Sequence, residues 1–286
     1  MKFGEYYKLT KPGIIRGNIL TAEGGFFLAS KGHVDIWLFI AMVVGTSLVI
    51  ASACVFNNYI DRDIDAAMER TKDRALVHGR ISARSALTYA SILGILGILV
   101  LAFYTNLSTV MVGIVGFIAY VFIYTQTKRT TVHGTLLGTI SGSMPIVAGY
   151  VSVTNQLDLG ALLLFLILVF WQMPHFFGIA IYRLDDYAAA KIPVLPVVKG
   201  IARTKVQILI YIIGFITATI LLSLFSYTGL VFAVVMASLG IYWFWLGFKD
   251  YKTAKNDAKW GKKMFLFSLI VILSLSVMLS VDSFLP

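Results

Sequence analysis

Long stretches without a charged residue constrain this chain more than any other feature. No Asp, Glu, Lys or Arg occurs between Arg84 and Lys128, and a second such stretch runs from Lys205 to Lys249. A bilayer core about 30 Å thick takes about 20 helical residues, so each stretch can hold two membrane spans joined by a short turn. The chain is 58% hydrophobic and only 13% charged, which excludes an ordinary soluble protein. We therefore interpret it as an integral membrane protein.

The uncharged stretches predict an all-α, polytopic fold in a single domain, residues 1–286. Helices are required because lipid cannot satisfy open backbone groups, and the stretches are too long for the strands of a membrane barrel. We expect nine transmembrane helices, an odd number that puts the two termini on opposite sides. The predicted spans are 13–31, 36–57, 86–104, 107–125, 134–152, 159–181, 206–226, 229–248 and 264–282.

The distribution of positive charge predicts the orientation. When alternate loops are assigned to opposite sides, all but Lys31 of the 24 Lys and Arg residues fall on the side of the N-terminus. The positive-inside rule makes that side the cytoplasm and puts the C-terminus in the periplasm of a bacterial inner membrane. This topology, with attraction to anionic membrane lipid, explains the net charge of +10 without a nucleic-acid partner.

An acidic segment, NNYIDRDID at residues 57–65, directly follows the second predicted span. Three carboxylates this close repel one another unless a cation lies among them. If the helix continues past the membrane interface, Asn57, Asp61 and Asp65 share one face. Oxygen ligands at this spacing suit Mg²⁺, which is commonly held by one or two carboxylates together with substrate phosphates.

A second acidic pair, Asp185 and Asp186, follows the sixth predicted span and could supply the facing half of such a site. The plainer alternative for either cluster is a solvated acidic loop end. Basic residues accompany both clusters, as a diphosphate site requires, although each taken singly also fits the positive-inside signal. The candidate diphosphate-binding residues are Arg70, Lys72, Arg74, Lys128, Arg129 and Lys191.

The order of these motifs resembles a known family. The patterns N-x-x-x-D-x-x-x-D, R-T-x-x-R and Y-x-x-x-K-R, followed by an aspartate pair after a later helix, are similar to those of the UbiA-type membrane prenyltransferases. Within that superfamily, SGSMPIVAGY at 141–150, WQMPHFFGIAIYRLDDY at 171–187 and AAAKIPVLPVVKGI resemble the protohaem IX farnesyltransferases. The resemblance extends over essentially the whole chain.

The resemblance implies a nine-helix bundle that joins farnesyl diphosphate to a vinyl group of protohaem IX, with addition of water, to give haem O and diphosphate. A haem-copper oxidase assembly route is the implied consumer. Asn58 stands where quinone-pathway relatives commonly carry the first aspartate, so metal binding is expected to depend on Asn57, Asp61 and Asp65 instead. The implied catalytic residues are Asp61, Asp65, Asp185, Asp186, Lys128 and Arg129, and the implied Mg²⁺ ligands are Asn57, Asp61, Asp65, Asp185 and Asp186.

The haem substrate also needs a binding surface. Pro174 removes a helix hydrogen-bond donor and can kink the sixth span, opening room for a flat ring beside His175. We therefore favour His175 as the haem contact, with His78 as the runner-up; the alternative is a histidine that only bonds a neighbouring helix. The candidate aromatic wall for an allylic cation consists of Phe56, Tyr124, Phe170, Trp171 and Tyr182.

Two rival functions differ in what they predict. A secondary transporter would place its polar site near the bilayer midplane, whereas the acidic clusters lie at one interface. Only Arg16 and Glu23, seven residues apart in the first predicted span, suggest a polar path there. An aromatic, quinone-precursor prenyltransferase keeps the same donor site, and only the resemblance around His175 argues against it. A purely structural scaffold gives no reason for two acidic clusters.

Overall fold

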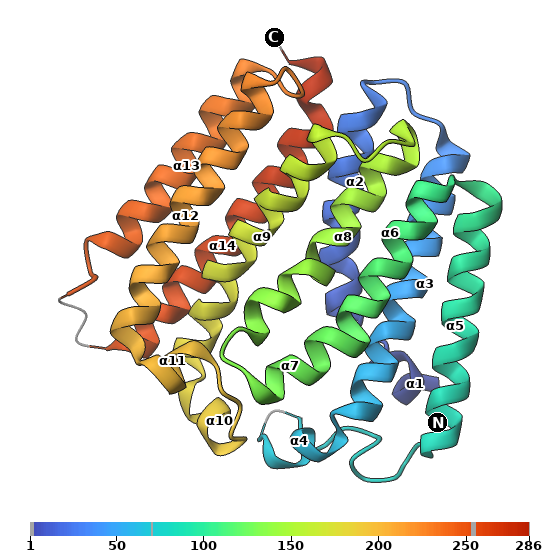
Figure 1. Ribbon diagram of the computed structural model, residues 1–286, viewed down its shortest axis with the longest axis vertical. Coiled ribbons are helices and arrows are strands. Elements are labelled where there is room, and N and C mark those ends of the chain that lie inside the picture. Colours follow the sequence, from blue (N-terminus) through green and yellow to red (C-terminus); the bar gives the residue numbers. More distant parts are fainter. Residues whose placement is uncertain (1–2, 70, 253–255, 286) are drawn as a thin grey trace.

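The computed structural model describes residues 3–69, 71–252 and 256–285, and every regular element in these residues is helical (Figure 1). Eight helical segments of this described part are long and apolar enough to cross a membrane. These segments are α3 (Ile36–Ile60), α5 (Ala83–Tyr104), the continuous run of α6 (Leu107–Ile118), η1 (Ala119–Tyr124) and α7 (Thr125–Thr130), α8 (Gly134–Thr154), α9 (Leu159–Tyr182), α12 (Ile201–Leu224), α13 (Leu230–Phe248), and α14 (Asp257–Val281) with η2 (Asp282–Phe284).

The first predicted span also forms a helix, α2 (Pro12–Ser30), but it is not among the eight. Its composition explains the difference, because it carries Arg16, Asn18 and Glu23 together with four glycines. Arg16 is exposed, and its Nε donates to the carbonyl oxygen of Pro12 at 3.4 Å. No ion pair joins Arg16 to Glu23 among the contacts of the described residues.

Short polar side chains set where several helices begin. The Asp35 carboxylate accepts hydrogen bonds from the backbone amides of Trp37 and Leu38 at the start of α3. Asn106 and Asp158 act in the same way at the starts of α6 and α9. Each side chain satisfies an amide that has no partner within its own helix. Helix starts in the loops are therefore encoded locally.

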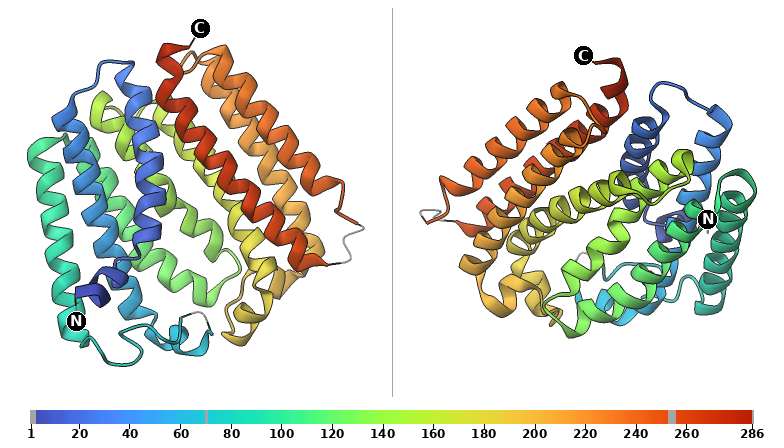
Figure 2. Two further views of the ribbon diagram at one scale, coloured as in Figure 1. Left: turned by 180° about the vertical axis from the view of Figure 1, so that it is seen from behind. Right: turned by 45° about the horizontal axis from the view of Figure 1, so that its top comes forward.

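The long helices form one bundle with α8 and α9 near its centre (Figures 1 and 2). Helix α8 packs against α2 and α6, whereas α9 packs against α12 and α14, and α3 packs against α5. The short helices α4 (Arg62–Ala67), α10 (Leu184–Ala189) and α11 (Leu195–Lys199) lie at one end of the bundle, the end at which α1 (Phe3–Leu9) also lies. The C-terminus lies at the opposite end from the N-terminus.

Glycine allows α2 and α8 to cross at close range. A Cβ atom on Gly149 of α8 would overlap the carbonyl oxygen of Ala22 in α2, and one on Gly25 would overlap the carbonyl oxygen of Ile146. Small residues at a crossing let two backbones touch, which is how membrane helices gain packing without a hydrophobic driving force. This contact fixes α2 against α8.

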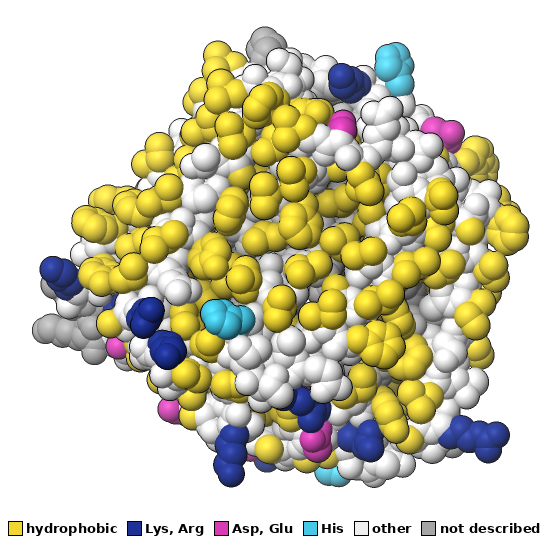
Figure 3. Space-filling view, in the orientation of Figure 1, with side chains coloured by type: hydrophobic (Ala, Val, Ile, Leu, Met, Phe, Trp, Pro, Cys, Tyr) yellow, Lys and Arg dark blue, Asp and Glu magenta, His cyan; other side chains and the backbone are white. Residues whose placement is uncertain are grey.

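On the face shown in Figure 3, the surface is apolar over the middle of the bundle. On the face shown, Lys and Arg side chains gather toward the end that carries α4, α10 and α11. That distribution agrees with the one-sided basic charge of the sequence.

Candidate active site

A cavity of about 930 Å³ opens inside the bundle, lined by α2, α3, α4, the α6–α7 segment, α8, α9, α10 and α14. Its volume is at the upper end of the range of about 300–1,000 Å³ that is usual for ligand pockets. Apolar and aromatic side chains line most of its depth. The charged lining residues all come from the segments near α4 and α10, and they are Lys11, Asp61, Asp65, Arg74, Lys128, Arg183 and Asp186.

The first acidic segment forms one wall of the cavity. Helix α3 ends at Ile60, but the backbone keeps its helical hydrogen bonds, from Asp61 N to Asn57 O at 2.9 Å and from Asp65 N to Asp61 O at 2.8 Å. Asn57, Asp61 and Asp65 therefore stand on one face, and all three line the cavity. Asp61 is only 3% exposed and Asp65 only 5%.

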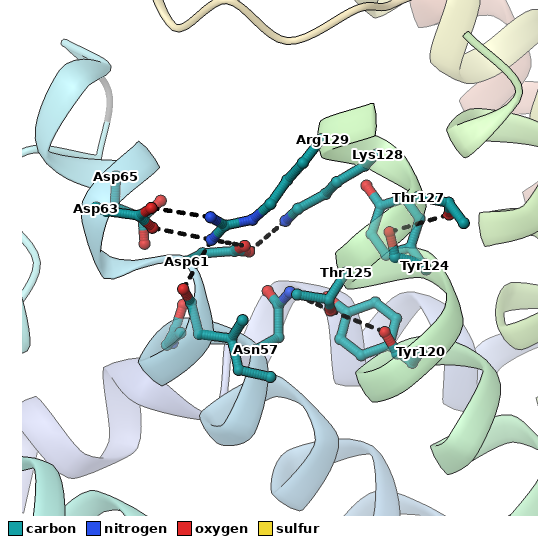
Figure 4. Close-up of polar contacts among 12 residues, drawn as sticks. Asn57, Asp61, Asp63, Asp65, Tyr120, Tyr124, Thr125, Thr127, Lys128 and Arg129 are labelled. Atoms are coloured by element: carbon teal, nitrogen blue, oxygen red, sulfur yellow. Dashed lines mark hydrogen bonds and ion pairs between the residues drawn. The ribbon is translucent and has the colours of Figure 1, made fainter. Parts of the chain in front are cut away.

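Basic side chains from two other segments neutralise this wall, and Figure 4 shows those from one of them, Lys128 and Arg129. Lys128 and Arg129, at the end of α7, both form ion pairs with Asp61. Arg74 binds Asp65 at 2.6 Å. Buried carboxylates need such partners, because an unpaired charge away from water is costly.

Arg129 and Arg74 each join two groups of the acidic segment. Arg129 holds Asp63 at 2.8 Å, and this hydrogen bond is the main cause that lowers the pKa of the Asp63 carboxyl. Arg74 also donates to the Asn58 side-chain oxygen at 2.9 Å. Asn58 thus serves as an anchor for Arg74.

A π-helical turn shapes the opposite wall. Residues Ala119–Tyr124 follow π geometry, which in other proteins is frequently found at functional sites. The rings of Tyr120 and Tyr124 stack with centroids 5.6 Å apart, and Lys128 Nζ lies 5.3 Å from the Tyr124 ring centre. Thr125 accepts a hydrogen bond from Asn57 Nδ2 at 3.0 Å. The turn thereby ties the basic wall to the acidic one.

Lys11 belongs to this site, although the sequence reasoning missed it. It precedes α2, and its Nζ donates to Asn57 Oδ1 at 2.6 Å. Burial is the main reason that the pKa of Lys11 falls from 10.5 to about 8. A lysine just before a span looks like an ordinary topological signal. The only further signal in the sequence is its position before Pro12, in the segment LTKPGII.

The second acidic pair reaches the cavity only in part. Asp186 lines it and lies 4.0 Å from Arg183, whereas Asp185 is exposed and is not among the lining residues. Some of the predicted basic residues also line the cavity, and others do not. Arg74 and Lys128 line the cavity, and Arg129 touches Asp61 behind it.

Three other predicted diphosphate-binding residues are not placed at the cavity. Lys72 is exposed and pairs with Glu69 at 2.7 Å, an interaction that raises the pKa of Lys72. Lys191 is exposed and lies outside the lining. Arg70 falls outside the described residues.

His175 lies deeper in the cavity wall, among aromatic rings. It stacks on Trp171 with ring centres 4.8 Å apart, and its Nδ1 lies 2.7 Å from the hydroxyl of Ser268 on α14. Of the predicted aromatic wall, Tyr124, Trp171 and Tyr182 line the cavity, whereas Phe56 and Phe170 do not. The alternative haem contact, His78, is exposed beside Asp73.

The donor set at the polar end suits a hard cation, but the side chains do not form a ready-made cage. Within the described ranges, no group of three or more His, Cys, Asp or Glu side chains is clustered so as to hold a metal ion. At the polar end of the lining, the carboxylates of Asp61, Asp65 and Asp186 and the amide of Asn57 offer oxygen atoms, a set typical of Mg²⁺ bound together with a substrate phosphate. The residues therefore fit a metal that arrives with its substrate.

Comparison with known proteins gives a consistent result. The UbiA prenyltransferase family matches residues 18–269. The chain is 51% identical over 283 residues to protoheme IX farnesyltransferase 2 of Pseudomonas fluorescens, covering 99% of this chain and 96% of that protein. It is 52% identical over 283 residues to protoheme IX farnesyltransferase of Yersinia pestis, covering 99% and 95%.

Solved structures share the fold at much lower identity. The structure of digeranylgeranylglyceryl phosphate synthase superposes with a TM-score of 0.80 at 17% identity, over 98% of this chain and 99% of that one. A UbiA homologue from Archaeoglobus fulgidus, solved with GPP and Mg²⁺, gives 0.74 at 14% identity, over 96% and 99%. The chain therefore belongs to the UbiA prenyltransferase family, in the branch of the protoheme IX farnesyltransferases.

Proposed function

We propose that this protein transfers the farnesyl group of farnesyl diphosphate to a vinyl group of protohaem IX, with addition of water, and releases haem O and diphosphate. The observation that carries the proposal is identity of 51–52% along almost the whole chain to proteins that bear the name of this activity. The cavity supports it, because a charged end adjoins a deep apolar wall within one space.

The chemical task is to break an allylic carbon–oxygen bond. Negative charge then grows on the diphosphate, and positive charge grows on the prenyl carbon. Lys11, Arg74 and Lys128 line the charged end, where they can bind diphosphate oxygens and stabilise the charge that develops on them. Arg129 supports Lys128 by sharing Asp61.

Oxygen donors at the same end would hold a divalent metal. Asp61 and Asp65 are the principal proposed ligands, with Asn57 from the same wall and Asp186 from α10 as further donors. When bound, Mg²⁺ would neutralise negative charge on the leaving diphosphate. Asp185 and Lys191 lie outside the cavity lining, so we assign them no contact with the diphosphate.

The aromatic part of the cavity would protect the allylic cation. Tyr124, Trp171 and Tyr182 line this part of the cavity. A cation over an aromatic face gains about 0.5–2 kcal/mol per contact. The haem vinyl group attacks this cation, so no side chain has to act as a nucleophile, and water captures the resulting cation beside the porphyrin. We propose that His175, deeper in the same wall, contacts the haem.

We also propose the finer points of topology. Helix α2 completes nine spans in a single domain of residues 1–286, with the N-terminus and the polar end of the cavity in the cytoplasm. The bilayer would be a bacterial inner membrane, and a haem-copper oxidase assembly route would use the product. The one-sided basic charge and the opposite positions of the two termini support this arrangement.

The test supplies purified protein with protohaem, farnesyl diphosphate and Mg²⁺, and follows the haem by mass spectrometry. We expect a product that has gained a farnesyl group and water, made by the wild type and by the control Asp63→Asn, but not by Asp61→Asn. The two aspartates are two residues apart, but only Asp61 lines the cavity. Chelation of divalent metal should stop turnover, and added Mg²⁺ should restore it.

Other results would change the assignment. Farnesylation of an aromatic quinone precursor in place of haem would show that the donor is correct but the acceptor is wrong. Failure of the wild type to bind farnesyl diphosphate would favour a secondary transporter. Full activity of Asp61→Asn would show that Asp61 is not a ligand of the metal.

A further inference from the structure

Ser268 and His175 form a hydrogen-bonded pair that the reaction scheme above leaves unexplained. The serine lies on α14 and the histidine on α9, and the histidine Nδ1 is 2.7 Å from the serine hydroxyl oxygen. The same hydroxyl lies 2.5 Å from the backbone carbonyl oxygen of Phe265. The direction of these two hydrogen bonds decides which nitrogen of the histidine carries the proton.

The serine has a single hydrogen to donate, and the carbonyl determines where it goes. A carbonyl oxygen can only accept, and two oxygens 2.5 Å apart would repel one another without a hydrogen between them. The hydroxyl hydrogen therefore points to Phe265. Only lone pairs remain for His175, so Nδ1 must be the protonated nitrogen and Nε2 must carry a free lone pair.

The surrounding helices hold this pair in register. The indole N–H of Trp171 donates to the backbone carbonyl of Ser268 at 2.8 Å. Gly178 and Gly261 bring α9 and α14 together, since a Cβ on Gly261 would lie 2.8 Å from the Gly178 carbonyl oxygen. Trp171 also stacks on the imidazole ring. The ring is thus fixed in position as well as in tautomer.

Nε2 is the part of the ring left for a ligand. His175 lines the cavity, and its Nε2 has no hydrogen-bond partner in the part of the chain that the structure describes. Nε2 is also not one of the fully buried polar atoms without a partner in that part of the chain. No carboxylate bonds to the ring among those residues either. An imidazolium formed here would therefore have no counter-charge, which disfavours a proton-accepting role.

A neutral imidazole that donates through one nitrogen and offers the other is the usual state of a metal-binding histidine. We infer that Ser268 fixes His175 as the Nδ1–H tautomer and that Nε2 ligates the iron of the haem substrate. This inference rests on the proposed function, because it requires haem in the cavity. Ser268 is a positioning residue, and it acts only through His175.

In the experiment, ferrous protohaem is titrated into the purified protein to measure its affinity. The iron–histidine stretching band of the complex is then recorded by resonance Raman spectroscopy. We expect the band in the wild type and its loss in His175→Ala. Ser268→Ala should keep the band but move it to lower frequency, because the imidazole loses its hydrogen-bond acceptor. It should also weaken haem binding by about 10–100-fold, the usual effect of losing such a partner. Ser268→Thr, which keeps a hydroxyl, should restore both values.

Ser276→Ala is the matched control. Ser276 is buried on the same helix, and its hydroxyl has no partner within the described residues and does not line the cavity. It should behave as the wild type, and its melting temperature shows what loss of a buried hydroxyl on α14 does to the fold alone.

Two results would overturn the inference. One is an unchanged band and affinity in His175→Ala, and the other is an unchanged band in Ser268→Ala. If the wild type makes haem O but shows no iron–histidine band, the ligand assignment fails while the function stands. If the wild type neither binds haem nor makes product, the proposed function itself fails.

Discussion

At the scale of single residues, the site is built from charges that neutralise one another before any substrate arrives. Lys11 gives the sharpest consequence, because burial lowers its pKa from 10.5 to about 8. Below pH 8 the amine is charged and attracts the diphosphate, and above pH 8 it becomes neutral. We expect the KM for farnesyl diphosphate to rise as the pH passes through about 8. Lys11→Arg stays charged and should remove this dependence.

The pH dependence of stability distinguishes weaker diphosphate binding, caused by deprotonation of Lys11, from unfolding of the protein. Between pH 8 and 10.5 the unfolded chain holds a proton on Lys11 that the folded chain has released, so the shift makes the fold more stable as pH rises. Activity and stability should therefore change in opposite directions in this window. A KM for farnesyl diphosphate that stays constant from pH 7 to 9 in the wild type would show that Lys11 does not bind the diphosphate.

The buried pair of Asp61 and Lys128 makes a second prediction at this scale. Lys128→Met leaves Asp61 with only part of its counter-charge at a position that is 3% exposed. Loss of one partner of a buried pair typically costs about 3–5 kcal/mol of unfolding free energy. The double variant Asp61→Asn with Lys128→Met should regain most of that stability but no activity. A double variant as unstable as the single one would show that the pair contributes more than charge balance.

At the scale of helices, hydropathy and charge gaps predict where most of the long apolar helices run, because they report directly on contact with lipid. The predicted span 86–104 is part of α5, Ala83–Tyr104, and the predicted span 159–181 nearly equals α9, Leu159–Tyr182. The π turn at Ala119–Tyr124 was not predicted, since it changes the backbone path without changing the composition. The roles of Lys11 and Ser268 were missed for a related reason: each depends on a partner far away in the sequence.

The crossing of α2 and α8 provides a test at the same scale. Gly149→Ala places a methyl group on the Ala22 carbonyl oxygen, and a backbone atom cannot move aside as a flexible side chain can. Overpacking of this kind typically costs about 1–3 kcal/mol, which should appear as a lower melting temperature in detergent. Gly17→Ala on α2 is the control, because nothing lies within 4 Å of its added Cβ. Equal melting temperatures for the two variants would mean that the crossing is looser than the structure indicates.

At the scale of the whole molecule, the number of spans and the side of the membrane on which the N-terminus lies depend on whether α2 crosses the membrane. Its 19 residues extend about 28 Å at 1.5 Å per residue, which nearly matches the bilayer core of about 30 Å. Because of its polar residues, α2 is not one of the eight helical segments that are apolar enough to cross a membrane. It nevertheless packs against α8 and α14. A helix held between membrane neighbours in this way can span without being apolar on every face.

Single cysteines report the crossing directly. Lys8 and His33 are both exposed and lie before and after α2, and the native Cys54 is buried, so background labelling should be low. In intact spheroplasts, a membrane-impermeant maleimide should label His33→Cys at once and Lys8→Cys only after permeabilisation. Gln156→Cys, in the exposed turn between α8 and α9, serves as the outside reference. If Lys8→Cys and His33→Cys label from the same side, α2 does not cross, and the number of spans is even.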